Sequence, residues 1–325
     1  MNPVLDTLPV LILYPHSRCN CRCVMCDIWK TDSVQEISAA ELERHGDDIV
    51  RLRVEWVVFS GGEPLMHSDL FRLCGFLRER NIRTTLLSTG LLIERYASQI
   101  VECLDDVIVS LDGPREIHDG IRRVPRAFDL LAAGVAALLN KDPDFAVSAR
   151  STVQSRNCGH LRATVDAARA LRLKSISFLA ADVSSEAFNR PGLWNIDRQN
   201  QVALSASQIS ALEIEIQALI DAGECGRFVR ETPEKLRRIV DHFQAHLGSR
   251  LPPAPRCNAP WVSAVLESDG TVRPCFFHPP VGTVATGASL AEVLNGPEAV
   301  GFRRDLNVST NAVCRRCVCS LHWKG

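Results

Sequence analysis

The sequence predicts an α/β fold in which helices cover a parallel sheet, followed by a smaller C-terminal part with little regular structure. In the first half of the 325 residues, short β-branched apolar runs alternate with amphipathic stretches. After about residue 182 this alternation stops. The 13 cysteines gather mainly near the two ends of the chain, which indicates two metal sites. A chain of this length has room for one large domain and a smaller one.

The expected strands are apolar runs at residues 10–14, 56–60, 83–88, 106–111, 146–153 and 175–180. Helical patterns separate them at 39–52, 70–80, 91–103, 127–139 and 160–171. Parallel neighbours need a crossover connection, so this repetition predicts a parallel sheet with outer helices. Polar residues and glycines follow several strands, where the functional groups of such sheets gather.

The rest of the chain is expected to contain few elements. Helical patterns occupy 207–222, 233–246 and 289–294, a proline-rich linker spans 251–255, and 268–270 signal a hairpin. We therefore predict a core domain at 1–185, a helical connector at 186–256 and a cysteine-rich domain at 257–325. The last domain buries little core by itself, so a metal staple is physically reasonable there.

Charge and hydropathy exclude several classes of protein. The chain has 37 Lys and Arg against 38 Asp and Glu, which gives no basic excess for nucleic acid or a membrane surface. No apolar run reaches the roughly 20 residues that cross a bilayer. The apolar run 8–14 lacks a basic lead-in and a cleavage site, so a cytoplasmic location is expected.

The first cysteine cluster follows the first strand with the spacing C-x3-C-x2-C, formed by Cys19, Cys23 and Cys26. Iron–sulfur clusters usually take four cysteines, so three would leave one iron open to another ligand. A zinc site is the alternative, because His16 lies close in sequence. The intervening Cys21 has no place in the spacing.

The second strand ends in Gly61-Gly62-Glu63-Pro64. Paired glycines let a backbone approach a ligand closely, and a glutamate after them can receive an ammonium group. Alone, this motif is equally consistent with a strand-to-helix turn that has proline near the helix start. One strand–helix unit after the three-cysteine loop, it is much more specific.

Together, these two motifs resemble the radical S-adenosylmethionine (SAM) superfamily over residues 1–185. The resemblance implies a partial six-unit (βα) barrel of the TIM type and a [4Fe–4S] cluster on Cys19, Cys23 and Cys26. The open iron would chelate SAM, while Gly61, Gly62 and Glu63 would line its methionine moiety. Cleavage of SAM would follow on an electron from flavodoxin or ferredoxin.

Three further residues are assigned by the resemblance. Ser110 and Asp112, after the fourth strand, would approach the SAM ribose or the substrate, and we count Asp112 as a catalytic candidate. Arg150 resembles the arginine that many relatives direct at the SAM carboxylate. A surface or salt-bridged strand residue is the alternative for Arg150.

The C-terminal cysteines are spaced C-x17-C, a gap, then C-x2-C, through Cys257, Cys275, Cys314 and Cys317. This order resembles the SPASM region of auxiliary iron–sulfur clusters or its shortened Twitch form. The Twitch form implies one [4Fe–4S] cluster on these four thiolates, which makes two clusters in all. A structural zinc is the alternative. Cys319 could replace Cys317, and His278 is expected on the hairpin surface.

The reaction expected from the resemblance is hydrogen abstraction from a small molecule, such as a sugar or aminocyclitol, followed by dehydrogenation. The first strand begins within about ten residues of Met1, which leaves no space for a peptide-recognition domain before it. A sugar epimerase is the alternative and needs a hydrogen-donating thiol, for which Cys225, Cys158 and Cys319 are candidates. A peptide maturase and a non-catalytic iron–sulfur or zinc protein stay open.

Overall fold

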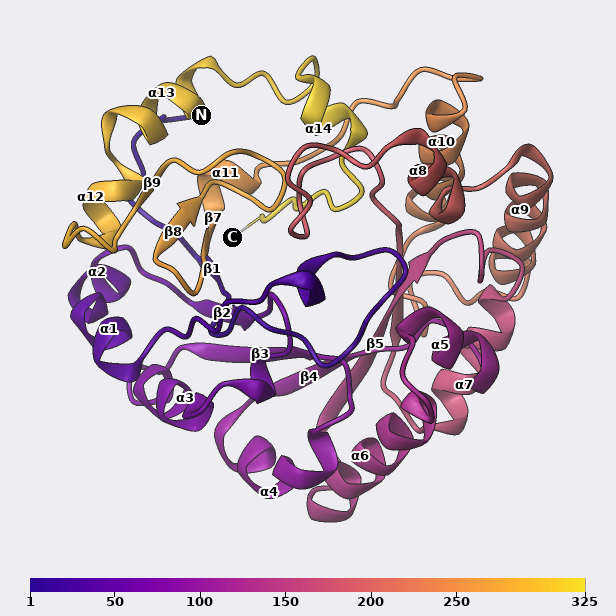
Figure 1. Cartoon of the computed structure of the whole chain (residues 1–325), viewed down its shortest axis with the longest axis horizontal. Helices are drawn as coiled ribbons and strands as arrows, with labels where there is room; N and C mark the ends of the chain where they lie inside the picture. The colour runs from indigo at the N-terminus through magenta and orange to yellow at the C-terminus, as the bar shows by residue number, and fades with distance from the viewer. Residues whose placement is uncertain (325) are drawn as a thin grey trace.

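The computed structural model describes residues 1–324 and contains a nine-stranded sheet that curves into a partial barrel (Figure 1). The strands are β1 (Val10–Leu13), β2 (Trp56–Phe59), β3 (Arg83–Ser88), β4 (Asp106–Ser110), β5 (Ala146–Val153), β6 (Ile176–Ala180), β7 (Ser263–Leu266), β8 (Thr271–Arg273) and β9 (Gly282–Thr283). Their order across the sheet is β6-β5-β4-β3-β2-β1-β7-β8-β9. Strands β1 to β6 pair in parallel, as the repeated strand–helix units predict.

Helices cover the outside of the barrel (Figure 1). In the first half they are α1 (Ala39–Arg44), α2 (Gly46–Arg51), α3 (Leu70–Arg78), α4 (Ile93–Cys103), α5 (Arg115–Arg122), α6 (Ala127–Lys141) and α7 (Leu161–Ala170). In the second half they are α8 (Ile196–Val202), α9 (Ala206–Asp221), α10 (Pro233–His246), α11 (Ala259–Val262), α12 (Leu290–Leu294), α13 (Pro297–Asp305) and α14 (Ala312–Arg316). Two short 3₁₀ turns, Ile28–Lys30 and Pro64–Met66, follow β1 and β2. No helix within residues 1–324 has the length and apolar character that crossing a membrane requires.

The cysteine-rich C-terminal part extends the barrel sheet. Strand β7 pairs in parallel with β1, with Val10 opposite Ser263, so β1 lies between β2 and β7. Strands β7 and β8 then form the antiparallel hairpin that the sequence predicts, and its turn contains Gly270 at φ +83°. The auxiliary segment therefore shares hydrogen bonds with the core sheet.

The six predicted strands are confirmed to within one residue at each end, but several helices differ from expectation. The helix predicted at 39–52 is two helices, because the chain turns at His45. Helix α5 was missed: the turn residues Asp112-Gly113-Pro114 indicated a loop, yet Pro114 caps this helix. Helix α8 lies within 186–202, where the sequence showed no helical pattern.

Candidate functional site

The three-cysteine loop leaves the carboxyl end of β1 and lies against the end of α5. The backbone N–H groups of Arg22 and Val24 donate to the carbonyls of Arg122 and Ile121, both at 3.1 Å. Cys19 and Cys26 are half-buried, and Cys23 is buried. Burial, reinforced by the nearby Cys23, raises the pKa of the Cys26 thiol to about 12 and raises that of Cys19 too. The three thiols are therefore electrostatic neighbours.

A buried guanidinium joins this loop to the strand that precedes α5. The Arg122 Nη2 atom lies 2.6 Å from Asp112 Oδ2, and its Nη1 atom lies 3.5 Å from Cys23 Sγ. Both side chains of the ion pair are less than 9% exposed. A hydrogen bond from the Cys21 thiol, together with Arg122, lowers the pKa of Cys23. These contacts therefore favour the thiolate of Cys23, which is the form that binds iron.

A second arginine clamps the other side of the loop. Arg190 pairs with Asp182 at 2.8 Å, and its Nη2 atom donates to the Met25 carbonyl at 2.7 Å. Its guanidinium stacks 3.9 Å from the Trp194 ring centre, and the indole N–H donates to Asp27 Oδ2 at 2.6 Å. This clamp was not found from the sequence, because its partners lie more than 150 residues apart.

The paired glycines after β2 support the cysteine loop. A Cβ atom on Gly62 would lie 1.9 Å from the Arg18 carbonyl oxygen, and Gly61 has φ +94° with the Tyr14 ring against it. The Glu63 N–H donates to the same Arg18 carbonyl at 2.9 Å. Glycine is required here because the backbone just before Cys19 occupies the space of a side chain.

The Glu63 carboxylate is fully buried and ties together the ends of two strands. It accepts hydrogen bonds from the Ser88 hydroxyl (3.0 Å), the Thr89 hydroxyl and N–H (2.7 Å each) and the Leu65 N–H (3.0 Å). Burial raises its pKa, which these donors partly offset. A contact between Glu63 and the SAM ammonium stays a prediction.

The other predicted SAM residues lie on β4 and β5. Ser110 is opposite Arg150, whose Nε atom lies 3.3 Å from Ser177 Oγ. Asp112 is fully buried and also accepts from the Thr152 N–H at 2.9 Å. The structure therefore brings Asp112 to the cysteine loop through Arg122, while Arg150 faces the barrel interior. The SAM roles of these three residues remain predictions.

All five C-terminal cysteines line one cavity of about 170 Å³, together with barrel residues such as Val58 and Arg150: they are Cys257, Cys275, Cys314, Cys317 and Cys319. Two of them accept backbone N–H groups, Cys257 from Ala259 at 3.4 Å and Cys317 from Cys319 at 3.3 Å. Such N–H···S contacts are typical of iron–sulfur ligands. His278 was expected on the surface, which is wrong: it is 5% exposed, and its Nε2 atom lies 3.2 Å from Cys314 Sγ.

A larger cavity of about 750 Å³ opens at the carboxyl ends of the strands. Its lining includes Gly61, Gly62 and Cys317. The clamp residues Asp182 and Arg190 also line it. The glycines predicted to contact SAM and one C-terminal cysteine therefore border one space.

Cys225 does not line this cavity, so its position gives no support to the predicted catalytic role. It forms a bridge with Val229, which in turn pairs with Ile176 at the start of β6. The functional groups lie at the opposite, carboxyl end of the parallel strands. Cys158 is buried near Ser155, with its Sγ atom 3.7 Å from that carbonyl.

Comparison with known families agrees with this arrangement. The family model of the radical SAM superfamily matches residues 13–142, and the model of the SPASM iron–sulfur cluster-binding domain matches residues 257–318. The chain therefore contains a radical SAM domain followed by a SPASM domain. Its cofactors are accordingly SAM and [4Fe–4S] clusters, one in the radical SAM domain and another in the SPASM domain.

The curated relatives of this chain have different names. The chain is 32% identical over 177 residues to an "Fe-coproporphyrin III synthase" of Methanosarcina barkeri, a match over 53% of this chain and 44% of that protein. It is 33% identical over 101 residues to a "Probable GTP 3',8-cyclase" of Methanococcus maripaludis, over 29% of this chain and 33% of that protein. Each match spans less than half of the curated relative.

Solved structures share the fold over nearly the whole chain. Streptococcus suis SuiB bound to S-adenosylmethionine has a TM-score of 0.68 at 14% identity, with 98% of this chain and 74% of that chain covered. The protein anSMEcpe with bound AdoMet has a TM-score of 0.67 at 20% identity, with 95% and 86% covered. At this identity the likeness supports the fold alone.

The residues present fit these clusters. Two buried guanidiniums, Arg122 and Arg190, offset the negative charge of a thiolate-bound cluster near Cys23 and Cys26.

Proposed function

We propose that this protein is a radical SAM oxidase of a small organic molecule, with the SPASM cluster as the acceptor of the second electron. When bound, the N-terminal cluster and SAM supply the 5′-deoxyadenosyl radical that removes a hydrogen atom from the substrate. A dehydrogenation then requires the loss of one more electron and one proton. The observation that supports this role is the 750 Å³ cavity, because its lining contains both the paired glycines Gly61 and Gly62 and the C-terminal Cys317.

The residues of the chain itself hold and shield this space. Arg190 donates to the Met25 carbonyl and Trp194 to the Asp27 carboxylate, which fixes the cysteine loop, and Glu63 fixes the ends of β2 and β3. Arg122 pairs with the Asp112 carboxylate at 2.6 Å and so holds it beside the loop. The protein thus contributes orientation and exclusion of water, while the cofactors contribute the radical chemistry.

A small-molecule substrate is supported by the curated relatives, whose names refer to porphyrin and GTP chemistry. A sugar or aminocyclitol substrate has no such support. Epimerisation is disfavoured because, among the described residues, Cys317 is the only cysteine that lines the larger cavity. The thiols considered as hydrogen donors, Cys158, Cys225 and Cys319, do not line it.

The test uses protein reconstituted anaerobically with iron and sulfide. Dithionite should produce 5′-deoxyadenosine from SAM, measured by chromatography and mass spectrometry. Replacing Cys19, Cys23 and Cys26 together by alanine should remove about half of the roughly eight irons and abolish that product. Persistent 5′-deoxyadenosine in the triple variant would refute the proposal.

The auxiliary role is tested separately by Cys314→Ala with Cys317→Ala. This variant should lose about four irons but keep SAM cleavage, because the other cluster is untouched. Full iron content in a soluble double variant would contradict the ligand assignment. Turnover in deuterated water tests whether the substrate is oxidised. Oxidation should give a product without solvent deuterium at the reacting carbon, whereas an unoxidised product with one deuterium there would indicate epimerisation.

A further inference from the structure

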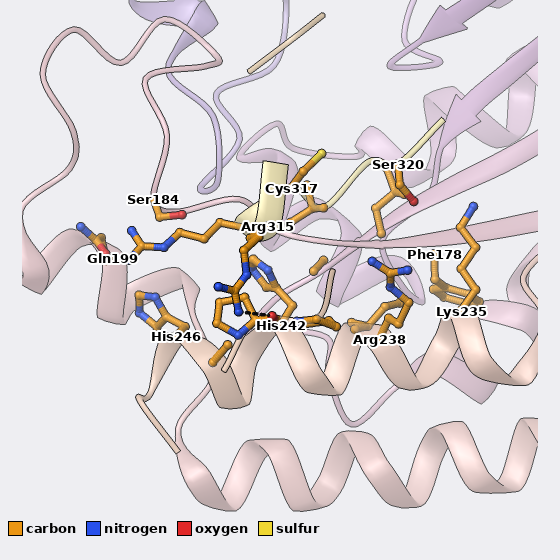
Figure 2. A pocket seen from close by; sticks show the side chains of 18 of the residues that line it. Phe178, Ser184, Gln199, Lys235, Arg238, His242, His246, Arg315, Cys317 and Ser320 are labelled. Atoms are coloured by element: carbon orange, nitrogen blue, oxygen red, sulfur yellow. Dashed lines mark hydrogen bonds between the residues drawn. The ribbon is translucent and has the colours of Figure 1, made fainter. Parts of the chain in front are cut away.

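A third cavity, of about 290 Å³, lies between α10 and the segment that contains α14 (Figure 2). It is lined by cationic or imidazole side chains, namely Lys235, Arg238, His242, His246, Arg315 and Arg316, and by no carboxylate. In the described part of the chain, none of its Lys and Arg side chains forms a salt bridge. The cavity is thus a concentrated positive region.

Four of these side chains come from one helix face. Lys235, Arg238, His242 and His246 are spaced three, four and four residues apart along α10, so they project on the same side. Arg315 approaches from the opposite wall, and its Nη2 atom donates to the Pro252 carbonyl at 2.9 Å. Figure 2 shows Arg315 directed toward the histidines of α10. That hydrogen bond holds the guanidinium in place without neutralising it.

The nearest carboxylates are already engaged. The Asp182 carboxylate interacts electrostatically with His242, but it forms an ion pair with Arg190 at 2.8 Å. The Glu231 carboxylate interacts electrostatically with Lys235, but it is buried and accepts a hydrogen bond from the Phe178 N–H at 3.0 Å. The positive charge of the cavity therefore has no partner within its own walls.

The imidazole of His242 does not add to this charge. Burial lowers the pKa of His242 to about 4, so the ring is neutral near pH 7, and the positive charge of the cavity comes from its Lys and Arg side chains.

This cationic cavity adjoins the larger one. Ser184, Arg316 and Cys317 line both the 290 Å³ and the 750 Å³ cavities. A molecule in the larger cavity could therefore extend a side group past Arg316 into the cationic one. An acidic protein surface would contact only its rim, because the lining residues enclose a space of small-molecule size.

We infer that the cavity between α10 and α14 binds a carboxylate or phosphate group of the substrate. This inference rests on the proposed function, since it assigns a chemical class to that substrate. Arg238, Lys235 and Arg316 would supply charge-assisted hydrogen bonds, which are stronger than neutral ones. The reacting carbon would then lie toward Gly61 and Gly62, in the larger cavity.

The test measures anion binding to the cluster-loaded protein by calorimetry, with glutarate as the carboxylate probe and inorganic phosphate as the other. The wild-type protein should bind at least one of them saturably, and more weakly as salt rises. Lys235→Gln with Arg238→Gln should weaken binding by about tenfold or more, the loss of a charged hydrogen bond. Arg316→Gln should weaken it as well.

The matched control is Arg44→Gln with Arg51→Gln. Both arginines are exposed on α1 and α2, which Figure 1 shows on the other side of the molecule from α10. This control removes the same charge and should bind the probe as the wild type does. Equal affinity in the Lys235 and Arg238 variant, or no saturable binding by the wild type, would overturn the inference.

Two further measurements separate the inference from the proposed function. Wild-type protein that cleaves SAM but binds neither probe would overturn the inference alone. Protein that binds a probe but does not cleave SAM would leave the anion site intact and refute the proposed function. If the Lys235 and Arg238 variant binds no less tightly but is slow only with reduced flavodoxin, the surface docks an acidic electron donor, and the inference is wrong.

Discussion

Replacing Gly62 by alanine should displace the three-cysteine loop, because the new methyl group would lie 1.9 Å from the Arg18 carbonyl oxygen and 2.6 Å from its carbon. Both are backbone atoms, so no flexible side chain can yield. The loop must retreat by roughly 1 Å, which costs about 1–3 kcal/mol as overpacking. The same movement breaks the 2.9 Å hydrogen bond from Glu63 N–H, worth about 0.5–1.5 kcal/mol.

The expected loss of about 2–4 kcal/mol in the free energy of unfolding is measured by urea denaturation. Iron content is measured in parallel and should fall toward the four irons of the auxiliary site. The control is Gly75→Ala in α3, where a Cβ meets no atom within 4 Å. That variant should be neutral or gain up to about 1 kcal/mol. Wild-type stability and iron content in Gly62→Ala would refute the packing argument.

Three more outcomes are expected. Arg122→Gln leaves the Asp112 carboxylate buried without its partner and should lower the free energy of unfolding by about 3–5 kcal/mol. Arg83→Gln, at an exposed ion pair, should lower it by less than about 1 kcal/mol in the same denaturation assay. Similar losses in both variants would contradict the assignment of a buried ion pair. Burial lowers the pKa of His118 to about 3, so between pH 3 and 6.5 only the unfolded chain binds the proton, and stability should fall as the pH drops from 6.5. His118→Asn should flatten that slope by up to about 1.4 kcal/mol per pH unit, and an unchanged slope would count against a buried neutral ring. Glu63→Gln should weaken SAM binding by roughly 1.5–3 kcal/mol through loss of charge, measured by titration; an unchanged dissociation constant with full iron would leave Glu63 as a support of the loop.

Local patterns in the sequence were sufficient for the six parallel strands β1 to β6. Each of these strands is a β-branched run bounded by turn residues, and Cys19, Cys23 and Cys26 lie within eight residues of one another. The ligand roles of the cysteines stay a prediction. Helix α5 was not predicted because Gly113 and Pro114 are turn formers, although proline is also favoured at the start of a helix. The break between α1 and α2 at His45 was not predicted because the helical spacing of apolar residues continues across it.

The contacts that fix the site are long-range and leave no local signal. The Arg190 clamp and the Arg122–Asp112–Cys23 contact depend on how distant loops converge at one end of the barrel. For the same reason Cys225 could not be placed from the sequence: a cysteine after a helix can lie at either end of the neighbouring strand. The burial of His278 against Cys314 likewise depends on a segment 36 residues further along.

The position of β1 between β2 and β7 has a consequence for synthesis of the protein. On the ribosome, one edge of β1 is satisfied once β2 emerges, but the other waits for Ser263–Leu266, about 250 residues after Val10. Until then the nascent barrel exposes an unpaired apolar edge next to three free thiols, and such edges recruit other chains. Chaperone protection and the timing of cluster insertion therefore concern the N-terminal strand throughout most of translation, even though it is among the first segments made.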